Sequence, residues 1–245
     1  MSQRYIKLSI EYDGTDFSGW QVQPNQRTVQ GEIERAINEL TGETIRVTGA
    51  GRTDAGVHAL GMVASFPYSG NLPLNAFKKG LNTHLPLDIY IHDAAIKKDY
   101  FDARRHATER AYRYVLSRRP TAVGRQYAWY PKQSFDIALM QEAANCLLGE
   151  HDFKSFAKED DEIDDYHSQV YLVNWVDNGN LVTFDIKAIR FFHNMIRILM
   201  GTMLRVGAGK LSVEQFKEIL ESRDSTLAGP TIPPTGLFLV YVHYE

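Results

Sequence analysis

The decapeptide at residues 49–58, Gly-Ala-Gly-Arg-Thr-Asp-Ala-Gly-Val-His, places one arginine and one aspartate among small residues. Apolar stretches at 45–47 and 57–66 flank it and are typical of strands. The glycines permit backbone angles and close approaches that side chains would block. A carboxylate on such a bend, Asp54, is placed to meet a ligand. The residues alone leave open a second interpretation, a glycine-rich hairpin in which Asp54 bonds its own backbone.

The first half of the chain surrounds this loop with a regular order of elements. Residues 5–12 alternate in hydropathy, which indicates a strand, and Thr28 begins a helix that ends near Gly42. Two strands then flank the decapeptide, a short helix covers 74–81, and a strand covers 89–94. The order β-α-β-β-α-β is typical of the ferredoxin-like split unit.

The second half repeats this theme less clearly. Its expected elements are strands at 111–117 and 126–130, a helix at 136–148, strands at 170–175 and 181–188, helices at 191–206 and from Ser212, and a strand at 237–244. Ser212 with Gln215 forms a capping box. A charged connector at 97–110 predicts two domains, 1–100 and 101–245, in an α+β chain of two ferredoxin-like halves.

Composition describes an ordinary globular protein. Of the 245 residues, 44% are hydrophobic and 23% are charged. The N-terminal residues form no secretory signal, and no apolar run reaches membrane-spanning length. The single cysteine, Cys146, excludes a disulfide within the chain. We therefore expect a cytoplasmic protein that does not enter a membrane.

Charge is unevenly distributed. The net charge of −3 argues weakly against a nucleic-acid partner, yet the segment 104–125 holds seven arginines interleaved with tyrosines. The run 159–165 is nearly all acidic, and we interpret it as a solvated loop. A basic face with aromatic residues favours RNA binding. The alternative is a sheet edge that charge protects from pairing.

The expected helix at 191–206 is apolar around most of its circumference. Its polar groups, among them Arg197, recur on one narrow stripe. A helix this apolar is mostly buried, which places Arg197 at the wall of a cleft, and a buried guanidinium requires an anionic partner. The residues alone do not distinguish a functional pair from a structural one.

Five ordered motifs resemble those of the TruA family of tRNA pseudouridine synthases. Residues 51–59 reproduce its run Gly-Arg-Thr-Asp-Ala-Gly-Val-His-Ala without a mismatch. Residues 12–21 resemble its first motif, 110–114 its Arg-x-Tyr-x-Tyr strand, 192–197 its helix that ends in arginine, and 236–240 its closing strand. The resemblance covers nearly the whole chain and implies two halves whose antiparallel sheets join around a central cleft.

The resemblance also implies a site. Asp54 is its nucleophile or base and pairs with Arg197, Tyr112 stacks on the uracil, and Leu237 lines the pocket. The target nucleotide must leave its stack, and Arg52, on the same bend as Asp54, is placed to fill the vacancy or to stack against the displaced nucleotide. The isomerisation needs no metal and no cofactor. Whether Asp54 attacks the base, attacks the sugar or removes a sugar proton stays open.

The implied partner is tRNA, modified at positions 38 to 40 of the anticodon stem-loop by a homodimer. The expected RNA contacts are Arg104, Arg105, Arg110, Arg118 and Arg119. The acidic run departs from the family, whose members carry a more neutral or basic segment there, which puts an RNA contact at that insert in doubt. Two alternatives are an RNA-binding protein without catalysis and a small-molecule enzyme that uses Asp54 as a covalent nucleophile.

Overall fold

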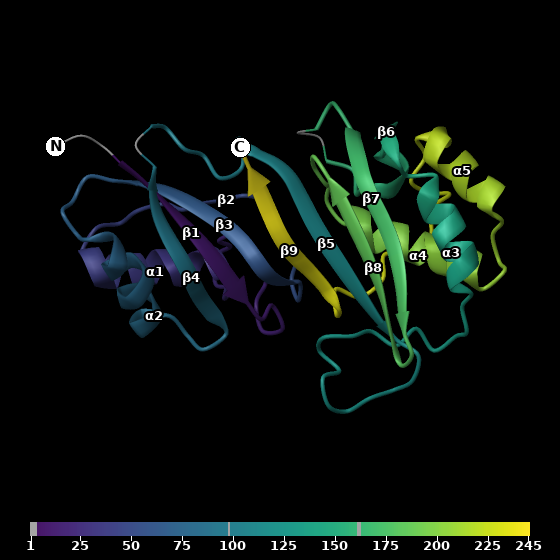
Figure 1. Cartoon of the computed structure of the whole chain (residues 1–245), viewed down its shortest axis with the longest axis horizontal. Helices are drawn as coiled ribbons and strands as arrows, with labels where there is room; N and C mark the ends of the chain where they lie inside the picture. The colour runs from purple at the N-terminus through teal and green to yellow at the C-terminus, as the bar shows by residue number, and fades with distance from the viewer. Residues whose placement is uncertain (1–3, 98, 161–162) are drawn as a thin grey trace. The chain divides into compact units, whose positions relative to one another are not determined.

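The computed structural model describes residues 4–97, 99–160 and 163–245. The chain forms two compact units (Figure 1): Met1–Thr108 with Phe238–Glu245, and Glu109–Leu237. The expected domains met at residue 100. The compact units instead meet at residue 108, and the C-terminal strand belongs with the first of them.

The first unit has the expected ferredoxin-like order. Its elements are β1 (Arg4–Tyr12), α1 (Val29–Thr41), β2 (Thr48–Gly49), β3 (His58–Tyr68), the π-helix η1 (Ala76–Gly80), α2 (Leu81–His84), β4 (Ile89–Lys97) and β9 (Leu237–Tyr244, whose first residue belongs to the second unit). The strands lie in the order β4-β1-β3-β2, each antiparallel to its neighbour. The residues Phe238 and Leu239 of β9 also pair with β3, in parallel register.

Local chemistry explains the ends and the faces of these elements. The Thr28 hydroxyl accepts a hydrogen bond from the Gly31 amide at the start of α1, and Gly42 ends the helix at a φ of 74°. Alternate residues of β1 (Ile6, Leu8 and Ile10) are fully buried, as the period of two predicts. The strand expected at 45–47 is wrong, because in this segment the pairing with β3 is at Thr48 and Gly49.

The second unit is also a helix-covered sheet. It contains β5 (Ala107–Ser117, which begins in the first unit), α3 (Ile137–Asn145), β6 (Gly149–Asp152), the 3-10 helix η2 (Lys154–Phe156), β7 (His167–Asn178), β8 (Leu181–Ala188), α4 (Met195–Gly207) and α5 (Val213–Ser222). The antiparallel order is β5-β8-β7-β6. Figure 1 shows the three helices gathered on one side of these strands. The α+β class is confirmed.

Two expected elements of this unit differ from the structure. The strand at 126–130 is wrong, because only Trp129 pairs, through its amide and carbonyl, with Val115 and Ser117 of β5. Pro120, Pro131 and the left-handed Gly124 surround it and prevent a longer ladder. The helix expected from residue 191 begins at Met195, since Asn194 is left-handed with a φ of 61°. By contrast, the capping box of α5 and the bounds of β8 and β9 are confirmed.

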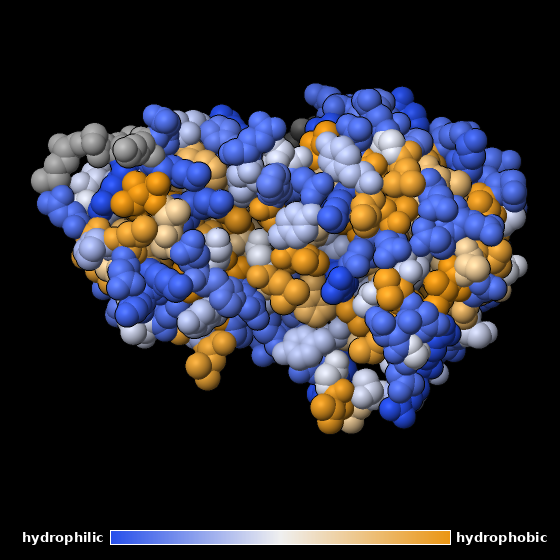
Figure 2. Space-filling model, in the orientation of Figure 1, coloured by the Kyte–Doolittle hydropathy of each residue, from blue (hydrophilic) through white to orange (hydrophobic). Residues whose placement is uncertain are grey.

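The surface has the mixed hydropathy that is usual for a globular protein. The face in Figure 2 mixes hydrophilic and hydrophobic residues over both units. Exposed large apolar side chains such as Leu87 and Val123 come from separate loops. Among the residues that the structure describes, no helix combines the length and the apolar character needed to cross a bilayer.

Candidate active site

Asp54 lies in an irregular loop between β2 and β3 and is half-buried. A turn follows it, in which the Val57 amide donates to the Asp54 carbonyl at 3.2 Å. Gly56 has a φ of 77°, a conformation that favours glycine, and its amide donates to the Phe17 carbonyl at 3.3 Å. The glycine of the motif is therefore needed to turn the chain directly after Asp54.

The segment that follows β1 packs against this loop. The Trp20 amide donates to the Thr53 carbonyl at 3.0 Å, and the Tyr12 hydroxyl lies 2.7 Å from Thr53 Oγ1. Gly19 lies so close that a Cβ there would approach the Thr53 carbonyl oxygen to 2.7 Å. The motif at 12–21 thus supports the residue directly before Asp54.

The other end of the loop is held by the same motif. His58 is buried, and its Nδ1 accepts a hydrogen bond from the Gly14 amide at 3.1 Å and lies 3.1 Å from Asp13 Oδ1. A Cβ on Gly14 would lie 2.0 Å from the Val57 carbonyl oxygen. Sequence reasoning gave these residues no role, although their motif was recognised. The periodicity of strands and helices does not reveal contacts between two loops.

Arg52, the other charged residue of the loop, presents an exposed side chain two residues before Asp54. Exposure is compatible with either role expected for it, filling the vacancy or stacking against the displaced nucleotide. Asp54 and Arg52 belong to the first unit, whereas Tyr112, Arg197 and Leu237 belong to the second.

Tyr112 lies on β5 opposite Ile186 of β8 and is 8% exposed. Its ring meets that of Phe191 edge to face, with centroids 5.0 Å apart and an angle of 75°. Because Phe191 precedes the turn into α4, this contact joins the strand to the start of the arginine helix. Leu237 is 4% exposed.

Arg197 is half-buried and anchors the segment before Leu237. Its Nε donates to the Ile232 carbonyl at 2.7 Å, and its Nη1 donates to Asn194 Oδ1 at 2.8 Å. The Tyr114 hydroxyl donates to the next carbonyl, that of Pro233, at 2.7 Å. Burial raises the pKa of Tyr114 well above its ordinary range, so this hydroxyl stays a donor. In the second unit, the strand motif and the arginine helix are thus both bonded to the segment that leads to the closing motif.

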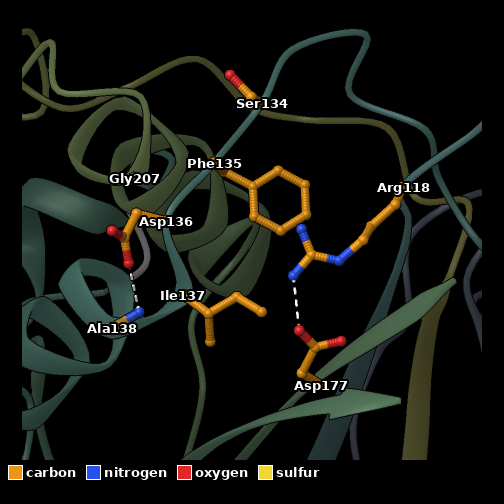
Figure 3. Close-up of a pocket in the computed structure, with 8 residues that line it drawn as sticks. All are labelled: Arg118, Ser134, Phe135, Asp136, Ile137, Ala138, Asp177 and Gly207. Atoms are coloured by element: carbon orange, nitrogen blue, oxygen red, sulfur yellow. Dashed lines mark hydrogen bonds and ion pairs between the residues drawn. The ribbon is translucent and has the colours of Figure 1, made fainter. Parts of the chain in front are cut away.

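The expected RNA-binding arginines have different surroundings. Arg118 Nη2 pairs with Asp177 Oδ2 at 2.7 Å, and its guanidinium lies over the Phe135 ring (Figure 3). Arg110 is half-buried, and its Nη1 donates to the Ile189 carbonyl at 2.6 Å. The side chains of Arg104, Arg105, Arg118 and Arg119 are exposed. Exposed side chains are the better placed of these to meet phosphates.

Arg118 also lines an open pocket of about 540 Å³ beside the start of α3 (Figure 3). The Asp136 carboxylate at its edge already accepts hydrogen bonds from the Ala138 and Leu139 amides. The helix terminus therefore has its own capping anion. Within 4–97, 99–160 and 163–245, no group of three or more His, Cys, Asp or Glu side chains is arranged to hold a metal ion.

The acidic run at 159–165 lies partly outside the described residues, at 161 and 162. Its last member, Asp165, is exposed yet bonded: Oδ1 accepts from the His167 amide at 2.9 Å, and Oδ2 pairs with Arg190. These contacts hold the entry to β7. Asp165 is thus exposed, as expected for a solvated loop, and is also bonded within the chain.

Comparison with known proteins agrees with this set of motifs. A model of the family described as tRNA pseudouridine synthase matches residues 8–104 and 143–245. A protein of Caldicellulosiruptor bescii named tRNA pseudouridine synthase A is 44% identical over 243 residues, which cover 98% of this chain and 100% of that one. Proteins with the same name from Geotalea uraniireducens and Brachyspira hyodysenteriae are 42% and 43% identical, over 98% and 95% of this chain and 100% and 95% of theirs.

A solved archaeal box H/ACA sRNP Nop10-Cbf5 complex aligns over 81% of this chain and 43% of that chain, with 11% identity and a TM-score of 0.36. A TM-score this low supports no conclusion about this chain, and the family assignment depends on the sequence matches alone. Their extent, together with the motifs that surround Asp54, shows that the chain belongs to the tRNA pseudouridine synthase family of isomerases.

Proposed function

We propose that this synthase converts uridine to pseudouridine on the 3′ side of the tRNA anticodon stem-loop, at positions 38 to 40, with Asp54 as its catalytic carboxylate. The observation that carries the proposal is the Asp54 loop. Its sequence at 51–59 reproduces the family motif, and contacts at Thr53 and His58 hold it on both sides of the half-buried carboxylate.

The chemistry rearranges one nucleoside. The C1′–N1 bond breaks, the uracil turns, and a C1′–C5 bond forms. C5 loses a proton and N1 gains one, so no electrons are exchanged with another molecule and no cofactor is proposed. Asp54 acts on the nucleoside as nucleophile or base. The route that it takes is left open in this proposal.

The remaining site residues have supporting roles in the proposal. Tyr112 stacks on the uracil while the base is detached, and Leu237 lines the pocket. Arg197 stabilises the charged form of the Asp54 carboxylate when the base excludes water, because desolvation disfavours an unpaired charge. Arg52 contacts the nucleotide displaced from its stack.

The proposed partner is tRNA, bound by a homodimer in the cytoplasm. Arg104, Arg105, Arg118 and Arg119 offer exposed cations for phosphate contacts, and Arg110 is placed less favourably because its side chain is half-buried. Phosphate contacts position the RNA and do not select a base. The choice of uridine then depends on the pocket and on the shape of the stem-loop.

The test is the change Asp54→Asn, which keeps the size of the side chain and removes its charge. We expect no measurable pseudouridine formation on a tRNA with uridines at 38 to 40, and tRNA affinity within a few-fold of wild type. Asp93→Asn, an exposed carboxylate on β4 of the same unit, is the matched control and keeps full activity. Appreciable turnover by the Asp54→Asn variant refutes the assignment. If the wild-type protein itself binds tRNA but forms no pseudouridine, the non-catalytic alternative is favoured.

A further inference from the structure

We propose that Tyr12 and Thr53 are positioning residues whose side-chain hydrogen bond fixes the loop that carries Asp54. The bond then sets the rate of the chemical step and contributes nothing to tRNA binding. This inference rests on the proposed function, because it takes Asp54 as the catalytic carboxylate.

The bond joins the end of a strand to the irregular loop. Tyr12 is the last residue of β1 and is 3% exposed, and Thr53 is 7% exposed. Their hydroxyl oxygens are 2.7 Å apart, the usual distance when one hydroxyl donates to another. Since both groups are buried, removal of either hydroxyl takes away a partner that water does not readily replace. Thr53 directly precedes Asp54, so the bond acts one residue from the carboxylate.

Thr53 is held on a second side by its backbone. Its carbonyl accepts from the Trp20 amide at 3.0 Å, and the backbone of Gly19 packs directly against it. Residues 50–57 belong to no helix or strand, so no regular ladder restrains Asp54. The orientation of the carboxylate therefore depends on individual contacts, and the hydrogen bond of the Tyr12 hydroxyl is one that a single-atom change can remove.

A small error in position has a large effect on rate. Misplacement of a reacting group by about 1 Å reduces a rate by roughly 100-fold. Loss of one restraint on a loop that keeps its backbone bonds moves the group less, and we expect a loss of roughly 10-fold in the chemical step. Affinity for tRNA is dominated by phosphate contacts elsewhere and stays unchanged.

The experiment compares Tyr12→Phe with Tyr244→Phe. Each change removes one tyrosine hydroxyl that makes a 2.7 Å hydrogen bond in the first unit, and the bond of Tyr244 goes to the Ala103 carbonyl, outside the loop. We expect Tyr12→Phe to slow single-turnover pseudouridine formation roughly 10-fold at unchanged tRNA affinity. We expect Tyr244→Phe to keep the wild-type rate and to change the melting temperature by about as much as Tyr12→Phe does.

Thr53 supplies the reciprocal test. Thr53→Ser retains the hydroxyl and keeps most of the rate, whereas Thr53→Val removes it and reproduces the loss seen in Tyr12→Phe. Because both changes break the same bond, the double variant Tyr12→Phe, Thr53→Val is no more than about twofold slower than either single variant. Multiplied losses in the double variant would overturn the proposal.

Hydrogen exchange gives a measurement that needs no turnover. The Trp20 and Val57 amides donate to the carbonyls of Thr53 and Asp54, and both exchange faster in Tyr12→Phe than in Tyr244→Phe. Equal exchange in the two variants overturns the proposal, and so does faster exchange with an unchanged chemical rate. A wild-type protein that forms no pseudouridine refutes the proposed function, and the exchange comparison still decides whether this bond orders the loop.

Discussion

The two units support their candidate residues in different ways. In the first unit, Asp54 lies in a loop whose position depends on contacts with the last residue of β1 and with the irregular segment that follows it, at 13–20. In the second unit, Tyr112 lies on a strand with eight paired positions, and Arg197 lies on a helix of 13 residues. Regular hydrogen bonding thus fixes Tyr112 and Arg197, whereas individual contacts fix Asp54. Substitutions around the loop should therefore reduce activity through position, and substitutions in the second unit should act through the altered side chain itself.

Within the second unit, the largest effect is expected at Arg197. Arg197→Met keeps the aliphatic bulk and removes the charge together with the bonds to Ile232 and Asn194. We expect activity to fall roughly 100- to 1,000-fold, the loss typical of removing one electrostatic stabiliser from an active site. Arg197→Lys should restore only part of the lost activity, because the point charge of an ammonium group does not reproduce the planar guanidinium. Single-turnover assays with melting curves measure both, and full activity of the Met variant would assign Arg197 a structural role only.

Gly14→Ala tests the loop through its supporting segment. The added Cβ would lie 2.0 Å from the Val57 carbonyl oxygen, a backbone atom that cannot rotate away. We expect roughly a 10- to 100-fold loss of activity through displacement of the turn after Asp54. Gly201→Ala is the matched variant in the second unit, where the Cβ would lie 1.9 Å from the Pro230 carbonyl oxygen.

If the two units differ as described, Gly14→Ala loses more activity for each degree by which it lowers the melting temperature than Gly201→Ala does. The first glycine supports an irregular loop, and the second lies in the regular helix α4. Equal ratios of activity to stability would show that the two units do not differ in this way.

The same difference explains what the sequence could predict. Alternation in β1 and β8, the caps of α1 and the capping box of α5 are local signals, and the elements that they predict are confirmed. Two results depend on pairing between distant residues, which periodicity does not encode. The short strand β6 forms, and the strand expected at 126–130 does not. For the candidate site, the motif identified Asp54, but the contact of Tyr12 with Thr53 joins residues 41 positions apart and could not be predicted.

A smaller effect is expected at the exposed arginines. The double change Arg104→Gln, Arg105→Gln removes two exposed cations of the first unit. If both contact phosphates, the slope of log K against log salt becomes shallower by roughly 1.4 to 1.8. The control is Arg113→Gln in the second unit. The Arg113 guanidinium forms a bidentate ion pair with Asp185, with distances of 2.7 and 3.0 Å. Binding titrations at several salt concentrations measure the slope, and an unchanged slope together with a lower melting temperature would indicate protection of a sheet edge.

The smallest effect concerns Asp165, which holds the entry to β7 in the second unit. Hydrogen bonds from the His167 amide and side chain, together with the Arg190 guanidinium, hold the pKa of Asp165 well below its usual range. A carboxylate with a lowered pKa stabilises the folded state at pH values above its unfolded pKa, near 3.8, and this contribution is lost as the pH falls toward the folded pKa. Because the group is exposed, water and salt screen most of the effect. Asp165→Asn should therefore lower the melting temperature by about 1 °C at pH 7 and by less at pH 3 or in high salt. Its activity should match wild type, since a regular strand begins there and no proposed site residue is displaced. An activity loss larger than the change in stability would place the acidic run near the bound RNA and would weaken the contrast between the two units.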